Sequence, residues 1–368
     1  MMVTKKKRKL TDALLLDALT RFGGKVTATE LAQLLGFPDR TIRYRLNRLK
    51  EKGYLDRIWT QTLDTKLGLG EVGIFLEMSN EYRSLPREFL FCFRNFYASY
   101  ATYGRYNGYF IAGGYPIATP QIIERILRAL TQMNIIRDFY RFYTLDFISL
   151  PADLSKYSPS AGWRWDWKEW VEQSEKTIKD GEPSGLEFNM NPGTMDYDHK
   201  DIAIIAELKA YDRITLKEIS RNVGLSETQV GVRIRRLKEA DVIRGSLWLI
   251  RPTPESVVLY TFVELNEPDD PALSCFRYLP FRKEIFIESP DKVGVRITMN
   301  SSDIVDYMRA FESLRSYFRS YFIQTAVNLQ VAPGGMHRFY HLHKESTGRW
   351  EMPVEEYIRN LEEFMKKH

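Results

Sequence analysis

The sequence predicts an α+β protein in which two winged helix-turn-helix domains alternate with two ferredoxin-like (βαββαβ) units. The first observation is a repeated basic helix, "TIRYRLNRLKEKGYL" at 41–55 and "QVGVRIRRLKEADVI" at 229–243. The second is that a matching helix and a glycine-containing turn precede both copies. The third is that the same alternation of strand-like and helix-like segments follows both copies. Such self-similarity indicates two related halves in one chain.

The overall composition is that of a folded chain with several domains. Its residues are 44% apolar and 27% charged, which argues against wholesale disorder. Its length of 368 residues exceeds that of one typical domain. The net charge of +5 is too small to indicate a nucleic-acid partner by itself. Cys92 and Cys275 are too few for a disulfide framework or a four-cysteine metal site, and we predict that they are buried apolar side chains.

The start of the chain is basic. Residues 1–10, "MMVTKKKRKL", lack the apolar core of a signal peptide, and no run of about 18 apolar residues that could cross a bilayer occurs in the sequence. We therefore expect a cytoplasmic protein without a membrane partner. The basic run at 5–9 forms either an arm that contacts DNA phosphates or a solubilising tail.

Each half begins with three predicted helices. The first helices, "LTDALLLDAL" and "DHKDIAIIAEL", have apolar residues at helical spacing. The second helices, in 26–37 and 214–225, begin with a Thr-x-x-Glu capping box, which satisfies backbone donors at a helix N-terminus. Gly36 and Gly224 then mark a tight turn, because glycine readily adopts positive φ.

The third helix of each half is the predicted DNA-recognition element. Its apolar residues recur at spacings of four and three, which assigns one face to the core. The inward residues are Ile42, Leu46 and Leu49 in the first copy, and Val230, Ile234 and Leu237 in the second.

Guanidinium, hydroxyl and amide groups on the outward face suit phosphates and base edges of double-stranded DNA, and a helix after such a turn fits the major groove. A solvated charged face is the alternative, and Arg45 or Arg233 could instead brace a neighbouring element. The predicted DNA contacts are Arg40, Thr41, Arg43, Tyr44, Arg45 and Arg48 in one half, and Ser226, Thr228, Gln229, Arg233 and Arg236 in the other.

The rest of each half predicts a short wing, a ferredoxin-like unit and an aromatic tail. Strand-like segments such as "EVGIFLEM" and "SVVLYTFVEL" open a βαββαβ order in both halves. Gly, Pro and Asn mark 175–196 as a linker. The predicted order is a basic arm at 1–10, winged helices at 11–62 and 197–252, ferredoxin-like units at 70–150 and 255–332, a Trp-rich tail and linker at 151–196, and a tail helix at 333–368.

Residues 196–245 resemble the N-terminal winged helix of the Lrp/AsnC (leucine-responsive regulator) family of transcription regulators. The βαββαβ unit that follows is similar to the family's effector-binding and assembly domain. The resemblance implies a sequence-specific DNA-binding regulator that is not an enzyme. Family members are usually half this length and dimerise, so the tandem chain implies an intrachain pseudo-dimer or a homo-oligomer that reads an imperfect palindrome.

The resemblance also implies a small-molecule effector, an amino acid or another metabolite. The family's effector loop corresponds to "YGRYNGYF", with Gly104 and Asn107 at the matching places, whereas "SPDKVGVR" in the second half lacks both. A simple turn is the alternative for these two residues. No cofactor is predicted.

An enzyme is the alternative reading, because siroheme decarboxylases are built on the same plan of two related halves. Residues 105–110 resemble their active-site strand. Such an enzyme needs His and Arg to hold tetrapyrrole carboxylates and to move protons. The first half of this chain contains no histidine, and we identify no catalytic residues.

Two aromatic segments remain. His337, His341 and His343 could converge on zinc, but no acid lies at motif spacing, so we predict a polar aromatic surface segment and no metal site. Trp163, Trp167 and Trp170 fall on one helical stripe. We expect them to dock the tail on the αβ unit of their own half, with an exposed partner surface as the alternative.

Overall fold

The computed structural model describes residues 10–158, 162–211, 213–250, 256–331 and 338–367, and it confirms the predicted fold class. The predicted basic arm lies almost entirely outside these residues. The first helix-turn-helix domain consists of α1 (Asp12–Phe22), α2 (Ala28–Leu35) and α3 (Asp39–Glu51). The capping box between Thr27 and Glu30 is present, and Gly36 ends α2 with φ +72°.

The second helix-turn-helix domain repeats this arrangement with α6 (His199–Ala210), α7 (Leu216–Val223) and α8 (Glu227–Glu239). Thr215 and Glu218 form the predicted capping box, and Gly224 ends α7 with φ +67°. The predicted inward faces of α3 and α8 are also correct: two of the three residues in each copy are fully covered, and Leu46 and Ile234 are half-buried.

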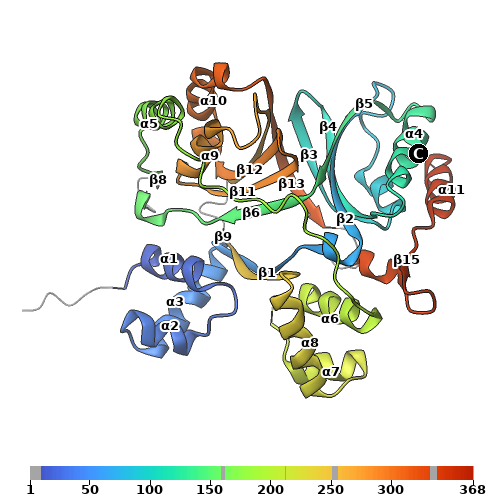
Figure 1. Cartoon of the computed structure of the whole chain (residues 1–368), viewed down its shortest axis with the longest axis horizontal. Helices are drawn as coiled ribbons and strands as arrows, with labels where there is room; N and C mark the ends of the chain where they lie inside the picture. Colours follow the sequence, from blue (N-terminus) through green and yellow to red (C-terminus); the bar gives the residue numbers. More distant parts are fainter. Residues whose placement is uncertain (1–9, 159–161, 212, 251–255, 332–337, 368) are drawn as a thin grey trace, which may run out of the picture.

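The predicted wings do not form separately. The strand after each third helix, β1 (Leu55–Thr62) and β9 (Ile243–Ile250), pairs with its counterpart from the other half in an antiparallel ribbon. Trp59 lies opposite Leu247 in this ladder. The ribbon pairs one edge of each strand and joins the two helix-turn-helix domains below the large sheet (Figure 1).

Both αβ units have the expected strand and helix order. The elements of the first unit are β2 (Leu69–Met78), η2 (Arg87–Cys92), β3 (Phe96–Gly104), β4 (Gly108–Pro116), α4 (Gln121–Gln132) and β5 (Ile136–Thr144). Those of the second are β10 (Ser256–Glu264), α9 (Ser274–Tyr278), β11 (Arg282–Ser289), β12 (Lys292–Asn300), α10 (Ile304–Ser313) and β13 (Ser320–Val331). The predicted first helix of unit one is only a 3₁₀ segment, η2.

The two units share one sheet. Among the described residues its order is β5-β2-β4-β3-β13-β10-β12-β11-β6, where β6 (Asp146–Leu150) is the strand that follows β5. The two edge strands are thus separated by Leu145 alone, so the sheet must curve until its edges approach. The backbone N–H of Leu145 donates to the carbonyl of Ile287 on β11 (2.7 Å). This curvature gives the sheet an inner face and an outer face.

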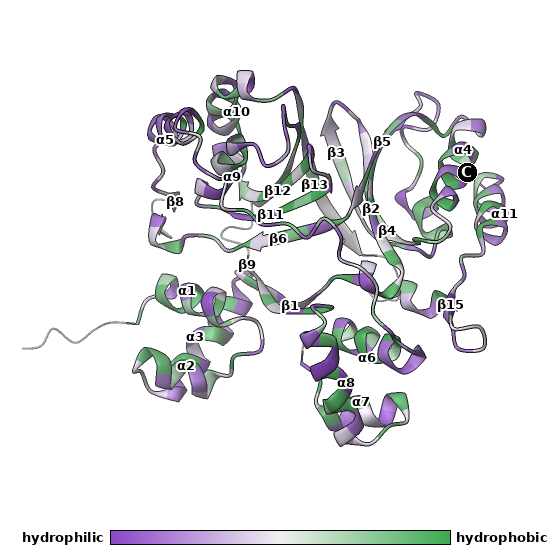
Figure 2. Ribbon diagram, viewed as in Figure 1, coloured by the Kyte–Doolittle hydropathy of each residue, from purple (hydrophilic) through white to green (hydrophobic). Residues whose placement is uncertain are grey.

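Side chains alternate between these two faces. On β2, Val72, Ile74 and Leu76 point outward and pack with the helices, whereas Glu71 and Gly73 line the interior. The covering helices α5 (Trp167–Lys179) and α10 are amphipathic, with purple and green residues on the same helix (Figure 2). None of the helices in the described part of the chain has the length and apolar character that a membrane span requires.

The two tail helices are exchanged between the units. Trp170 on α5 is 1% exposed, and its Nε1 donates to the carbonyl of Cys275 in the second unit (2.8 Å). The tail helix α11 (Val354–Met365) packs on the first unit instead, where Tyr357 contacts Phe93. The prediction that the Trp-rich tail docks on its own unit is therefore wrong. The reason is that β6 crosses to β11 and carries the following segment with it.

We expect Trp170→Ala to lower the free energy of unfolding by about 3–5 kcal/mol, because it leaves a large cavity and removes a hydrogen bond. Urea unfolding of the full chain would measure this. The matched control is Lys168→Ala on the exposed face of α5, for which we expect a change below about 0.5 kcal/mol. Equal effects of the two substitutions would contradict the exchanged docking.

Candidate DNA-binding surface and central cavity

The outward face of α3 is a basic, solvent-exposed surface. Tyr44 keeps 65% of its accessible area. Arg43 donates to Asp39 Oδ2 (2.6 Å), but a pair this exposed is weak and leaves the guanidinium available. Thr41 is half-buried. The exposed side chains of the predicted set in this half are Arg40, Arg43, Tyr44 and Arg48.

Arg45 and Arg233 lie at matching positions and make matching contacts. Arg45 Nη1 donates to Asp12 at the start of α1 (2.5 Å). Arg233 donates through both terminal nitrogens to Asp198, the N-cap of α6 (2.8 Å each). Burial opposes the ionised state of Asp198, but hydrogen bonds from Arg233 lower the pKa of that carboxyl. Both arginines therefore brace the recognition helix against the first helix of their own domain.

Arg236 is also engaged within the domain. It forms a short ion pair with the fully buried carboxylate of Asp201, which also accepts a hydrogen bond from Arg233 Nη1 (2.9 Å). Arg236 nevertheless keeps 45% of its side-chain area exposed, so one side of its guanidinium still faces solvent. The two arginines offset the cost of burying one carboxylate.

The start of α8 is capped by residues that were predicted to contact DNA. Ser226 Oγ accepts from the backbone N–H of Gln229 (3.2 Å), and Gln229 Oε1 accepts from the backbone N–H of Ser226 (2.9 Å). This reciprocal cap uses the carbonyl oxygen of Gln229 and leaves its amide NH₂ to donate. Thr228 is exposed beside it. Pro38 at the same place in the first half makes no such cap.

Gly104 and Asn107 close the hairpin between β3 and β4. Asn107 Nδ2 donates to the carbonyl of Gly104 (3.2 Å), and Gly104 has φ +142°. This geometry is that of a simple turn, which was the alternative to an effector loop. Neither residue lines the cavity inside the curved sheet. The effector-binding prediction for this pair therefore stays a prediction.

A central cavity of about 660 Å³ lies inside the curved sheet. Its walls come from both units and from the β1–β9 ribbon, through residues such as Trp59. Phe110 and Tyr260, which belong to different units, pack against one another in its wall with ring centroids 4.8 Å apart. A cavity of this volume suits a small organic ligand.

Charged groups on the strands face into this cavity. Arg296 on β12 donates to Glu284 on β11 (2.9 Å) and to the hydroxyl of Tyr100 on β3 (3.1 Å). The hydroxyl of Tyr97, also on β3, donates to Glu71 Oε1 on β2 (2.7 Å). Burial raises the pKa of Glu71, which favours its neutral form.

The sequence carried a signal for this cavity that the helix-centred predictions missed. In "RKEIFIES", Arg282, Glu284 and Phe286 alternate with Lys283, Ile285 and Ile287. The first set lines the cavity, and the second set is largely buried toward the helices. Charged residues at every second position of a strand that is covered on its other face predict a polar interior.

Comparisons with known proteins place the chain in a family. Residues 197–244 match the model described as "Winged helix-turn-helix DNA-binding", and residues 9–60 match that of the MarR family. The "Proline dehydrogenase transcriptional activator" of Rhodobacter capsulatus is 32% identical over 118 residues, which cover 30% of this chain and 76% of that protein. The chain belongs to the Lrp/AsnC family.

Two further similarities fit this assignment. The "HTH-type transcriptional regulator LrpA" of Mycobacterium tuberculosis is 35% identical over 78 residues, which cover 20% of this Lrp/AsnC chain and 52% of that protein. The crystal structure of the siroheme decarboxylase NirDL superposes with a TM-score of 0.53 at 12% identity, covering 97% of this chain and 99% of that one. This second likeness is one of fold over the whole tandem arrangement.

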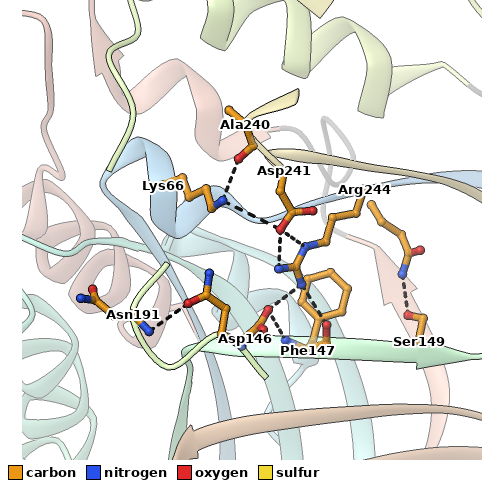
Figure 3. A network of polar contacts seen from close by, with 10 residues as sticks. Lys66, Asp146, Phe147, Ser149, Asn191, Ala240, Asp241 and Arg244 are labelled. Atoms are coloured by element: carbon orange, nitrogen blue, oxygen red, sulfur yellow. Dashed lines mark hydrogen bonds and ion pairs between the residues drawn. The ribbon is translucent and has the colours of Figure 1, made fainter. Parts of the chain in front are cut away.

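A polar network anchors the second helix-turn-helix domain of this Lrp/AsnC protein to the sheet (Figure 3). Arg244 donates to Asp146 Oδ1 (2.5 Å) and to the carbonyl of Phe147 (2.9 Å), and it also pairs with Asp241 (2.9 Å). Lys66 Nζ donates to a carbonyl at the end of α8 (2.7 Å). The Arg244 guanidinium lies over the Phe147 ring, 5.1 Å from its centroid, and Phe147 lines the cavity.

A pair of histidines joins the C-terminal tail to α6. His343 is 2% exposed, and its Nδ1 lies 3.0 Å from Nδ1 of His199, with the rings stacked. The prediction of a surface segment is therefore wrong at His343, because the tail folds back onto the second domain. His337 lies outside the described residues. Burial, and then the nearby His199, lower the pKa of His343.

We expect this pair to make the domain less stable in acid. Since the folded-state pKa of His343 is lowered, the unfolded chain binds more protons below about pH 6.5, and stability is lost as pH falls through that range. The free energy of unfolding should decrease between about pH 7.5 and about pH 5.5. His343→Gln should flatten this dependence. An unchanged slope in His343→Gln would refute the assignment.

Proposed function

We propose that this protein is a sequence-specific transcription regulator in which one chain supplies both recognition helices of a dimer-like unit. The observation that supports this most strongly is the β1–β9 ribbon, which holds two helix-turn-helix domains on the same side of the sheet (Figure 1). Regulators with paired recognition helices contact half-sites about one helical turn of DNA apart.

The proposed DNA contacts differ between the halves. In the first, Arg40, Arg43, Tyr44 and Arg48 are exposed and face outward. In the second, the equivalent surface offers Thr228, the amide NH₂ of Gln229 and the open side of Arg236. Arg45 and Arg233 are assigned to bracing. The two half-sites are therefore expected to differ in sequence, and the first half to contribute more phosphate contacts.

The αβ units are proposed to sense a small molecule. The cavity touches the β1–β9 ribbon through Trp59 and the second domain through Lys209. A ligand that prefers one arrangement of these walls would bias the spacing of the recognition helices. The outer helices of the αβ units are proposed as the surfaces for assembly into larger homo-oligomers.

We expect Arg48→Ala and Tyr44→Ala each to weaken binding to a selected operator by about tenfold, about 1.4 kcal/mol. Arg48→Ala should also reduce the slope of log affinity against log salt by about one, because a phosphate contact is lost, and Tyr44→Ala should not. The operator would come from random DNA selected with the full chain, and affinities from fluorescence anisotropy.

The control for these variants is Arg315→Ala, which removes the same charge from an exposed site on the second αβ unit. It should bind the operator like the parent chain. DNase footprinting should show two protected half-sites for each chain. Protection of a single half-site would overturn the proposal. A loss of operator affinity in Arg315→Ala equal to that in Arg48→Ala would also overturn it.

Siroheme decarboxylation is the second candidate function. The fold match to NirDL over nearly the whole chain favours it. The described residues that line the cavity include no histidine, so the site lacks an obvious imidazole to move protons.

We expect siroheme incubated anaerobically with the purified protein to keep all its carboxyl groups, because the described residues that line the cavity include no histidine. Mass spectrometry of the extracted tetrapyrrole would measure this, with a protein-free sample as control. Loss of carboxyl groups only in the presence of the protein would establish the enzyme instead.

A further inference from the structure

The cavity wall carries an unbalanced positive charge. Arg282 and Arg296 both face the single carboxylate of Glu284, with nitrogen–oxygen distances of 3.5 Å and 2.9 Å. Two guanidinium groups on one carboxylate leave one positive charge without an anion. Within the described part of the chain, Nε of Arg296 has no hydrogen-bond partner although it is buried.

The accessible surface of Arg296 opens onto the cavity. The residue lies in the middle of β12, between paired strands on both sides, yet 28% of its side chain remains accessible. Since Val295 and Ile297, its neighbours on β12, are buried toward the helices, alternation places Arg296 on the inner face. A guanidinium in this position can present two parallel N–H groups to a carboxylate.

The other charges in the cavity do not offset this excess. Asp64 Oδ2 already accepts from Lys209 (3.4 Å) and from the hydroxyl of Tyr340 (2.6 Å). Glu71 accepts from Tyr97, and burial raises the pKa of its carboxyl. The acids of the wall are thus partnered within the protein or favoured in their neutral form, so the excess positive charge beside Glu284 calls for an anionic group.

The remainder of the wall is aromatic. The rings of Tyr260, Phe262 and Phe110 form a continuous surface, with Phe110 and Tyr260 4.8 Å apart and Tyr260 nearly parallel to Phe262. Gly73 keeps this surface open, because a Cβ there would lie 2.9 Å from the Phe110 ring. Such rings favour offset stacking or edge contacts with another aromatic ring.

We propose that the central cavity binds a small aromatic carboxylate, whose carboxylate pairs with Arg296 and whose ring packs against Phe110, Tyr260 and Phe262. This inference rests on the proposed sensing role of the cavity and names the class of molecule that it senses. One carboxylate neutralises the excess charge of the cluster formed by Arg282, Glu284 and Arg296.

The test uses the full-length protein without DNA and two matched probes, naphthoate and its neutral amide, naphthamide. The two probes share ring and size and differ only in charge. Isothermal titration calorimetry should show naphthoate binding at least about tenfold tighter than naphthamide, because an ion pair with a buried guanidinium exceeds a neutral hydrogen bond. This comparison needs no substitution and is independent of how well a variant folds.

Two variants locate the binding. Arg296→Gln should lower the affinity for naphthoate at least about tenfold and leave that for naphthamide nearly unchanged. Ala112→Leu adds apolar bulk on β4 inside the cavity while keeping every charge, and should weaken both probes alike. Arg315→Gln, on the outer surface, is the control and should change neither affinity. Circular dichroism would check that each variant is folded.

Several outcomes would overturn the inference. These are equal affinities for the two probes, absence of binding by both, an Arg296→Gln effect as large on the amide as on the acid, or binding of siroheme but not of naphthoate. The affinity of the protein for its operator is measured without any ligand. Failure here with intact operator binding would therefore reject only the ligand class, whereas loss of operator binding would reject the regulator itself.

Discussion

Backbone hydrogen bonds between the two halves are the interaction on which the rest of the molecule depends. β1 pairs with β9, β3 with β13, and β6 with β11, and each ladder joins a strand of one half to a strand of the other. An unpaired strand edge is costly or prone to aggregation, so neither half is complete alone. The ribbon positions the recognition helices, and the curved sheet creates the cavity. The exchanged tail helices α5 and α11 add buried aromatic contacts between the two halves of the chain.

The duplication nevertheless produced an asymmetric molecule. Arg244, which also pairs with Asp241, ties the second helix-turn-helix domain to β6, and the aligned positions in the first half hold Asp56 and Gly53. The first domain instead packs α1 on the ribbon and on residues after β6. A change in the cavity wall at Phe147 would therefore reach the second domain through Arg244 and not the first in the same way. Coupling of this kind requires a ligand with different affinity for two arrangements.

For the candidate DNA-binding surface, contacts between residues close in the chain could be predicted from the sequence, and contacts between distant residues could not. Apolar spacing in α3 correctly separated Ile42 and Leu49 from the exposed Arg43 and Arg48, because helix geometry alone decides which side chains share a face. The bracing of Arg45 by Asp12 could be raised only as an alternative. Its partner lies on another helix, and no local pattern reveals which acid a flexible guanidinium will reach.

The sequence by itself determined the repeat, the caps and turns of both helix-turn-helix domains, and the βαββαβ order, because these follow from periodicity and local hydrogen bonding. Only the tertiary structure decided that the wings pair with each other, that the Trp-rich tail crosses to the second unit, and that Arg282, Glu284 and Arg296 converge on a cavity. Strand pairing between two similar halves has several registers and partners that local patterns cannot rank. The choice among them was set by closing one sheet whose edges, β5 and β6, are joined through Leu145.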